Sequence, residues 1–179
     1  WNQFHVPQIS GDIHWAGLRL ELKNMKIDFY GGRGYGTAAF EFDPDTPGTQ
    51  YSFVFTTTNT ILQDLMEDYF HKTNSLEGTL NGNLVVSKAN SADWRTVNGY
   101  GSLAFRDGYI WDVPIFGVFS PILDSIIPGL GKSRASSATC TFLINNGVVR
   151  SNDLESRAPT LRLQYRGDMD LQGGVQARV

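Results

Sequence analysis

The sequence predicts a mainly β protein built on one strongly curved antiparallel sheet, a groove or half-barrel, with two short helical segments packed on it. Three observations predict this class. Apolar and polar residues alternate with a period of two along most of the chain, turn signals separate the alternating runs at short spacing, and glycines fall inside the runs. One apolar face and one solvent-exposed polar face are typical of an antiparallel sheet, whereas a parallel sheet is usually covered on both faces.

The alternating runs place their apolar residues on one face of each expected strand. Leu18, Leu20 and Leu22 alternate with charged residues. The same alternation recurs in the runs 51–55, 76–86, 99–105 and 161–171. We expect about eight to ten strands, mostly joined to their sequence neighbours in a meander. Asn81, Asn83 and Tyr100 fall on the polar face of this sheet.

Turn residues separate the expected strands. Tyr30-Gly31-Gly32 and Asp43-Pro44-Asp45 are turn signals. Asp107-Gly108 and Asn145-Asn146-Gly147 are stronger hairpin signals, because Asp-Gly and Asn-Gly tolerate the positive φ angles of a type I′ turn. We therefore expect a hairpin at each of the last two positions.

The segment Thr60–Thr73 has the spacing of an amphipathic helix. Its apolar residues recur at helical intervals with acidic and amide residues opposite them. Thr58 or Asn59 is the expected N-cap, and the helix is expected to run for about three to four turns and pack one-sidedly on the sheet.

The segment Val113–Gly131 is apolar almost throughout, with Asp124 as its one charged residue. Pro121 kinks or restarts the helix, and Pro128 is expected to end it. Two interpretations stay open: a helical plug that completes a core on the sheet, or the lining of a groove that accepts an acyl chain. Insertion into a membrane surface is less favoured, because Lys132 and Arg134 are the only cations nearby.

Glycines inside the alternating runs are a further signal. Glycine within a strand costs about 0.5–1 kcal/mol relative to alanine, so its presence marks curvature, a bulge or the close approach of another group. The residues concerned, Gly78, Gly82, Gly99, Gly101 and Gly167, share the aliphatic face. A strongly curved sheet with an apolar concave side is the expected consequence.

The residues that usually carry chemistry are scattered. His5, His14 and His71 lie in different expected elements without a partner at metal-ligand spacing. Cys140 is the only cysteine, and its place in an alternating run predicts a small packing residue. We therefore expect no metal and no cofactor.

The chain also lacks the usual signatures of an enzyme or a nucleic-acid-binding protein. A formal net charge of −3 argues against a nucleic-acid surface, which needs a basic patch. The sequence contains neither a nucleophile-elbow nor a zinc-protease motif. Two facing carboxylates of a glycosidase, with Asp168 and Asp170 as candidates, stay a minor alternative. We expect no catalytic residue.

From Leu76 onward, the order of glycine-marked hairpins resembles the C-terminal region of the AsmA-like family of Gram-negative envelope proteins, to which TamB-related proteins belong. The resemblance covers over half of the chain and rests on the order of several segments, since no single motif is diagnostic. These segments are 76–84, 98–110, 113–116, 136–149, 153–156 and 163–171. The earlier segments 22–27 and 30–32 are similar to preceding repeats of the same family.

This resemblance implies a single fragment, 1–179, of a longer protein. Residues 1–74 supply preceding strands and the amphipathic helix, and residues 75–179 form the best-matching region. The implied location is the periplasm, with a tether to the inner membrane through an anchor upstream of the chain. The implied partners are phospholipid or another acyl-chain lipid, and envelope proteins.

The expected function is non-enzymatic lipid handling or transfer by the end piece of a longer apolar β-groove involved in outer-membrane biogenesis. The alternative is a structural or scaffolding module of the cell envelope whose core is filled. Under the first hypothesis the candidate lining residues are Leu80, Leu84, Leu103, Phe105, Ile115, Phe116, Phe119, Ile122, Leu123, Ile126 and Ile127.

Overall fold

The computed structural model describes residues 6–70, 73, 77–108, 135–158, 161–171 and 175–178. These residues form ten strands and one helix. In chain order the elements are β1 (Gln8–Ala16), β2 (Arg19–Phe29), β3 (Gly32–Glu41), β4 (Gln50–Ile61), α1 (Leu62–Phe70), β5 (Thr79–Asn90), β6 (Asp93–Gly108), β7 (Ala135–Asn145), β8 (Val148–Ala158), β9 (Leu161–Asp170) and β10 (Val175–Arg178).

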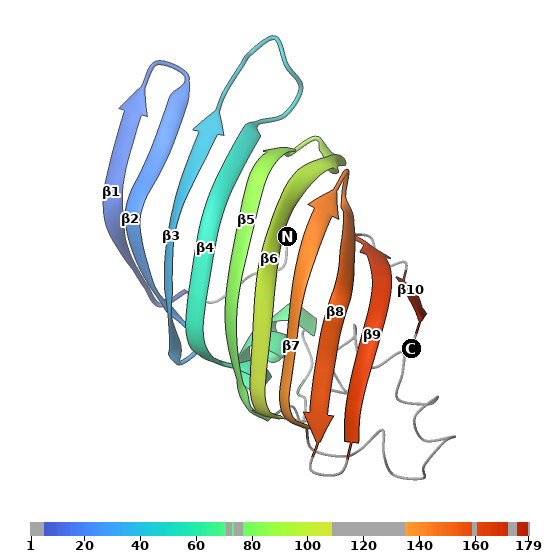
Figure 1. Ribbon diagram of the computed structural model, residues 1–179. Coiled ribbons are helices and arrows are strands. Elements are labelled where there is room, and N and C mark those ends of the chain that lie inside the picture. Colours follow the sequence, from blue (N-terminus) through green and yellow to red (C-terminus); the bar gives the residue numbers. More distant parts are fainter. Residues whose placement is uncertain are drawn as a thin grey trace.

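The ten strands form one antiparallel sheet in which the spatial order equals the order in the chain (Figure 1). The sheet is open, with β1 and β10 at its two ends. The predicted antiparallel meander is therefore confirmed. Residues 1–74 and 75–179 share this sheet, because β4 pairs directly with β5.

The register gives the sheet two chemically different faces. Directly paired residues lie on the same face, and Phe55, Leu84, Gly101 and Phe142 are successive partners from β4 to β7. We call the face that carries these residues the apolar face. The opposite face, called the polar face, carries the alternate residues, and its matching row is Thr56, Asn83, Ser102 and Thr141.

Glycines of the apolar face lie beside large side chains. The ring of Phe55 covers Gly34, and the ring of Phe142 covers Gly101. A side chain at Gly101 would collide with this ring and with the carbonyl oxygen of Asn83. Close approach of another group, one of the three explanations predicted for the strand glycines, therefore holds at Gly101.

The helix α1 begins later than the sequence predicts. Thr58 and Asn59 are not its N-cap, because β4 continues to Ile61 and both residues belong to that strand. The first helical N–H, that of Leu62, instead donates to the carbonyl oxygen of Gly78 at 3.1 Å. With nine residues the helix makes about two and a half turns, fewer than expected.

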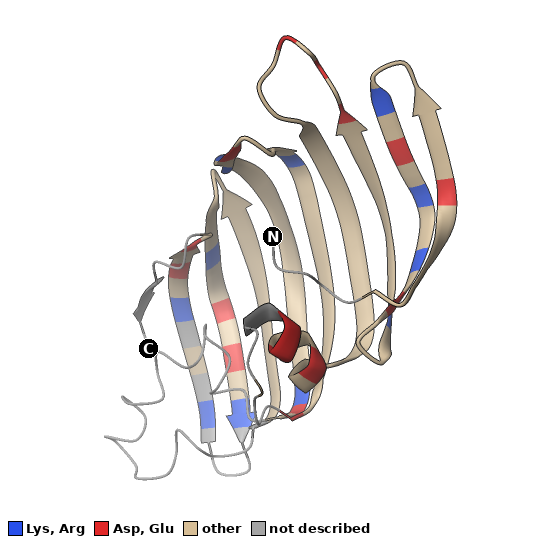
Figure 2. Cartoon of the chain, turned by 180° about the vertical axis from the view of Figure 1, so that it is seen from behind, with Lys and Arg blue, Asp and Glu red and all other residues tan. Residues whose placement is uncertain are grey.

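α1 lies against the apolar face near one end of the strands (Figure 2). Its Leu62 and Leu65 side chains are buried there, as the amphipathic pattern predicts. The hydroxyl of Tyr30, in the β2–β3 turn, donates to the Asp68 carboxylate at 2.6 Å. This bond joins the helix to a strand pair distant in sequence. The second expected helical segment, 113–131, lies outside the described residues.

Two predicted turns are confirmed. Tyr30 and Gly31, with φ angles of 46° and 74°, connect β2 to β3. Asn146 and Gly147, with φ angles of 51° and 75°, connect β7 to β8. Both pairs have positive φ at two consecutive residues, as in the type I′ turns that suit the twist of a hairpin.

Two local predictions are wrong. Asp107-Gly108 is not a hairpin turn but the end of β6, where Gly108 pairs with Ala135. Asp107 does adopt a positive φ of 55°, so the local conformation matches the sequence signal but the chain continues as a strand. Leu18 lies in the β1–β2 turn beside Gly17 rather than on a strand face, because Ala16 pairs with Arg19.

We predict that Gly101→Ala lowers the free energy of unfolding by about 1–3 kcal/mol, because the new methyl group overpacks against backbone as well as against the Phe142 ring. The neighbouring Ser102→Ala variant, on the polar face, is the control and should change it by less than about 0.5 kcal/mol. Urea unfolding followed by circular dichroism measures both. Equal midpoints for the two variants would contradict the close approach.

Candidate functional site

An unbroken apolar row crosses the whole sheet, with one residue from each strand. Each member of the row is the direct partner of the next. From β1 to β10 the row consists of Ile13, Leu22, Ala38, Phe53, Val86, Gly99, Ile144, Val149, Met169 and Val175. Nine strand spacings make it about 43 Å long. In the middle of the row Val86 and Ile144 are buried in a packed cluster, whereas Ile13 at the β1 end is exposed. This row is the centre of the candidate functional site.

The apolar face is closed at the end where α1 lies. Successive partners in this region, from β4 to β8, are buried: Thr60, Leu80, Phe105, Ala138 and Ser156. A 2.6 Å hydrogen bond joins the buried Thr57 and Thr60 hydroxyls, and the Thr57 hydroxyl also donates to the carbonyl oxygen of Arg33 at 3.3 Å. This end of the face is therefore a packed core rather than an accessible surface.

The described candidate lining residues divide between two environments. Leu80 and Phe105, at 7% and 5% exposure, belong to the packed end. Leu84 and Leu103 are half-buried and lie farther from the helix on the same face. The other candidates lie outside the described residues: Ile115, Phe116, Phe119, Ile122, Leu123, Ile126 and Ile127.

The β1 end of the apolar face is open. Ile13 and Trp15 are 73% and 65% exposed, and Trp15 stacks on Phe42 with ring centroids 5.8 Å apart. These two residues and Ile9 were not among the sequence candidates. Their period-two spacing was the signal that could have identified them, since it continues the alternation seen in the other strands.

Charged groups on β8 and β9 pair with each other. The Arg150 guanidinium donates two hydrogen bonds to Asp168, at 2.8 and 2.7 Å, and lowers the pKa of that carboxyl. Hydrogen bonds from Arg162 and Arg157 lower the pKa of Glu155 to about 2. Carboxylates held ionised in this way stabilise a surface and do not act as general acids. Asp168 is thus a poor candidate for a glycosidase acid.

Cys140 has the environment of a packing residue. It lies on the apolar face opposite Leu103. Burial, together with the nearby Asp153 carboxylate, raises the pKa of the thiol to about 11. Among the described residues, no cluster of three or more histidine, cysteine or acidic side chains is arranged to hold a metal ion.

No helix in the described part of the chain has the length and apolar character needed to cross a bilayer. No protein-family model matches the chain, and no curated protein or solved structure matches it either.

We predict that Cys140 in the folded protein reacts slowly with iodoacetamide at pH 8. A pKa of about 11 instead of the ordinary 9.0 leaves about a hundredfold less thiolate, and only the thiolate attacks. Mass spectrometry of timed samples measures the reaction, with urea-unfolded protein as the control that should alkylate readily. Equal rates in the two samples would contradict the assigned environment.

We predict an acid-dependent loss of the Glu155 interactions. Because the folded-state pKa lies below the ordinary 4.5, their stabilisation is fully present above about pH 4.5 and is lost as the pH falls towards 2. The urea midpoints of wild type and Glu155→Gln should therefore differ at neutral pH and converge near pH 2. Glu67→Gln, on the exposed side of α1, serves as the control. A difference between the two urea midpoints that persists at pH 2 would contradict the lowered pKa of Glu155.

Proposed function

We propose that this chain is a non-enzymatic lipid-handling module whose apolar face holds acyl chains as the end piece of a longer β-groove. The observation that carries the proposal is the unbroken apolar row from Ile13 to Val175. Each buried methylene of an acyl chain contributes about 0.8 kcal/mol, so a continuous apolar surface can hold a lipid without specific polar contacts.

The dimensions of the row support a path rather than a pocket for one ligand. One leaflet contributes about half of the roughly 30 Å hydrocarbon core of a bilayer, so the 43 Å row exceeds one acyl chain more than twofold. In this proposal the sheet curves strongly and its concave apolar side shields the chains from water.

The exposed edge at β1 supports continuation of the groove. A long edge strand that exposes backbone hydrogen-bonding groups together with Ile13 and Trp15 is an aggregation hazard unless another strand covers it. In this proposal a further strand pairs with β1 and carries its own alternate apolar residues, which extends the apolar face beyond Trp15.

The resemblance to the AsmA-like family supports the cellular setting of the proposal. It suggests the periplasm, a tether to the inner membrane, phospholipid or another acyl-chain lipid as the cargo, and envelope proteins as partners in outer-membrane biogenesis. The alternative is a scaffold of the envelope. The buried cluster of Val86, Ala89, Val97 and Ile144 is the observation that favours it, because a filled core leaves no room for lipid.

Neighbouring residues on β4 provide a matched test. Phe53 faces the apolar side and Val54 the polar side. We predict that p-benzoylphenylalanine at Phe53, irradiated with phosphatidylethanolamine–phosphatidylglycerol vesicles, forms a lipid adduct that mass spectrometry detects. The same photo-crosslinker at Val54 should form none.

Native mass spectrometry and solvent extraction of the purified wild-type protein complete the test. Co-purifying phospholipid is expected. A folded protein that carries no lipid and forms no adduct at Phe53 would refute lipid handling and leave the scaffold.

A further inference from the structure

An exposed apolar stripe crosses the otherwise polar face of the sheet. Val54, Val85, Tyr100 and Leu143 are successive direct partners on β4 to β7. Tyr100 and Leu143 are 53% and 56% exposed, and Val54 is also exposed. We call these four residues the Tyr100 stripe. It spans three strand spacings, about 14 Å, and the lipid proposal does not use it.

Uncharged polar residues flank the stripe. Thr56, Asn83, Ser102 and Thr141 form the next row of direct partners, and the exposed Tyr35 extends this row onto β3. Asn83 donates one Nδ2 hydrogen to the Thr56 hydroxyl at 3.0 Å. An amide has a second N–H and a carbonyl oxygen, so Asn83 retains bonding capacity for a ligand.

Two hollows adjoin the stripe. The first, of about 570 Å³, is lined by Val54 and Val85 together with neighbouring serine and threonine residues. Its lining includes Lys23 and Glu21, whose charged groups pair with each other at 2.6 Å. The polar side chains around this hollow thus offer hydroxyl groups rather than an uncompensated charge.

The second hollow, of about 440 Å³, lies over the flanking row. Its charged residue, Asp153, accepts hydrogen bonds from the hydroxyl and backbone N–H of Thr141 at 2.6 and 2.8 Å. This carboxylate is therefore already engaged within the protein. Both hollows have a hydroxyl-rich and partly apolar lining, and the single charge in the lining of the second is the Asp153 carboxylate, which the Thr141 hydroxyl and N–H already bond.

The charge pattern limits what this surface can bind. In β3 to β7 the charged residues lie near the strand ends, and the middle of these strands is uncharged (Figure 2). Phosphate groups of nucleic acid need a basic surface. A bare acyl chain would bury the flanking hydroxyl and amide groups without partners, at a cost in free energy. A neutral, amphipathic ligand needs no basic surface, and its polar groups can bond the flanking hydroxyl and amide groups.

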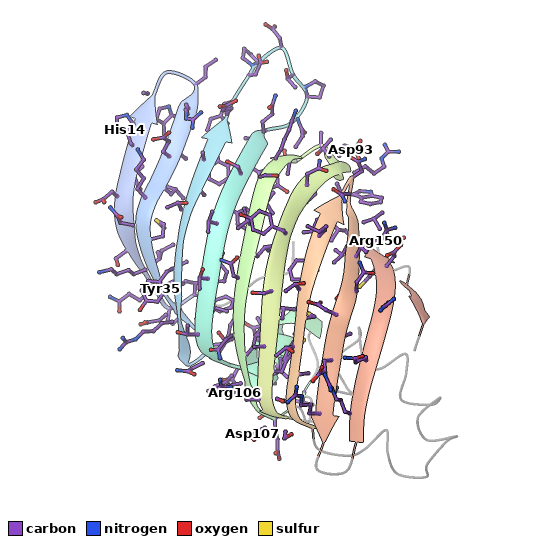
Figure 3. The ribbon with its side chains drawn as sticks, in the orientation of Figure 1. His14, Tyr35, Asp93, Arg106, Asp107 and Arg150 are labelled. Carbon is purple, nitrogen blue, oxygen red and sulfur yellow. The ribbon has the colours of Figure 1, made fainter. Side chains whose placement is uncertain are left out.

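We propose that the Tyr100 stripe and its flanking polar row bind a neutral glycan chain. A sugar ring presents C–H groups that stack on an exposed tyrosine ring, while its hydroxyl groups reach the polar residues beside it. Tyr35 and Tyr100 are separated by three strands and two residues, about 16 Å, which suits several linked sugar rings. Figure 3 shows Tyr35 among the side chains of this face.

The test is a calorimetric titration of the full chain with linear oligosaccharides of glucose and of N-acetylglucosamine. Tyr100→Ala should weaken binding at least about tenfold, equivalent to about 1.4 kcal/mol, whereas Tyr100→Phe keeps the ring and should bind as wild type does. Trp15→Ala, which removes an exposed aromatic ring from the opposite face, is the control and should leave binding unchanged.

Three results would overturn the proposal. The first is a folded wild-type protein that binds neither oligosaccharide series, and the second is a Tyr100→Ala variant of unchanged affinity. The third is self-association in sedimentation experiments that Tyr100→Ala abolishes, since the stripe would then be a protein interface. None of these results bears on lipid adducts at Phe53, because the two proposals use opposite faces of the sheet.

Discussion

The structure depends on shielding one apolar face of a single-layer sheet from water. The described strands form one layer, and within the described residues the only element that covers part of the apolar face is α1. Burial of apolar surface is the main favourable term in folding, so a sheet with one uncovered face has less of it than a two-layer domain. The apolar face is fully buried in the packed row near α1, and it is most exposed to water near β1.

The large side chains of the apolar face lie beside glycines. The Phe55 ring lies over Gly34 and the Phe142 ring over Gly101, so aromatic surface is removed from water without a second sheet. The same arrangement reduces the exposure of backbone that glycine would otherwise leave uncovered. Glycine, which weakens a strand by itself, is here part of how the face packs.

The two faces differ in charge as well as in polarity. Ion pairs such as Arg150–Asp168 lie on the β8–β9 side, and Lys23–Glu21 lies on β2 near the other end of the sheet. The strands between these regions are uncharged along their middles, so the polar face has a neutral centre with charged margins. An acyl-chain surface and a neutral hydroxyl-binding surface can therefore occupy one sheet without competing for the same side chains.

Local sequence patterns determined the class of fold, the face of most residues and two of the turns. Period-two alternation correctly places Leu84 and Leu103 on one side and Asn83 and Tyr100 on the other, because side-chain direction alternates along any strand. Asn146-Gly147 encodes its own turn through positive φ angles. The helical spacing around Leu62 and Leu65 likewise follows from local geometry alone.

Which residues lie next to each other across strands depends on the folded arrangement of the strands. Tyr100 and Leu143 are far apart in sequence, and they lie side by side only because β6 and β7 pair in one particular register. The pairing of β4 with β5 continues to Ile61, so α1 begins only at Leu62. Alternation along a strand determines which face a side chain lies on. Its neighbour on the next strand depends on the register of the whole strand pair. That is why the Tyr100 stripe, which joins residues of four strands, is visible only in the folded chain.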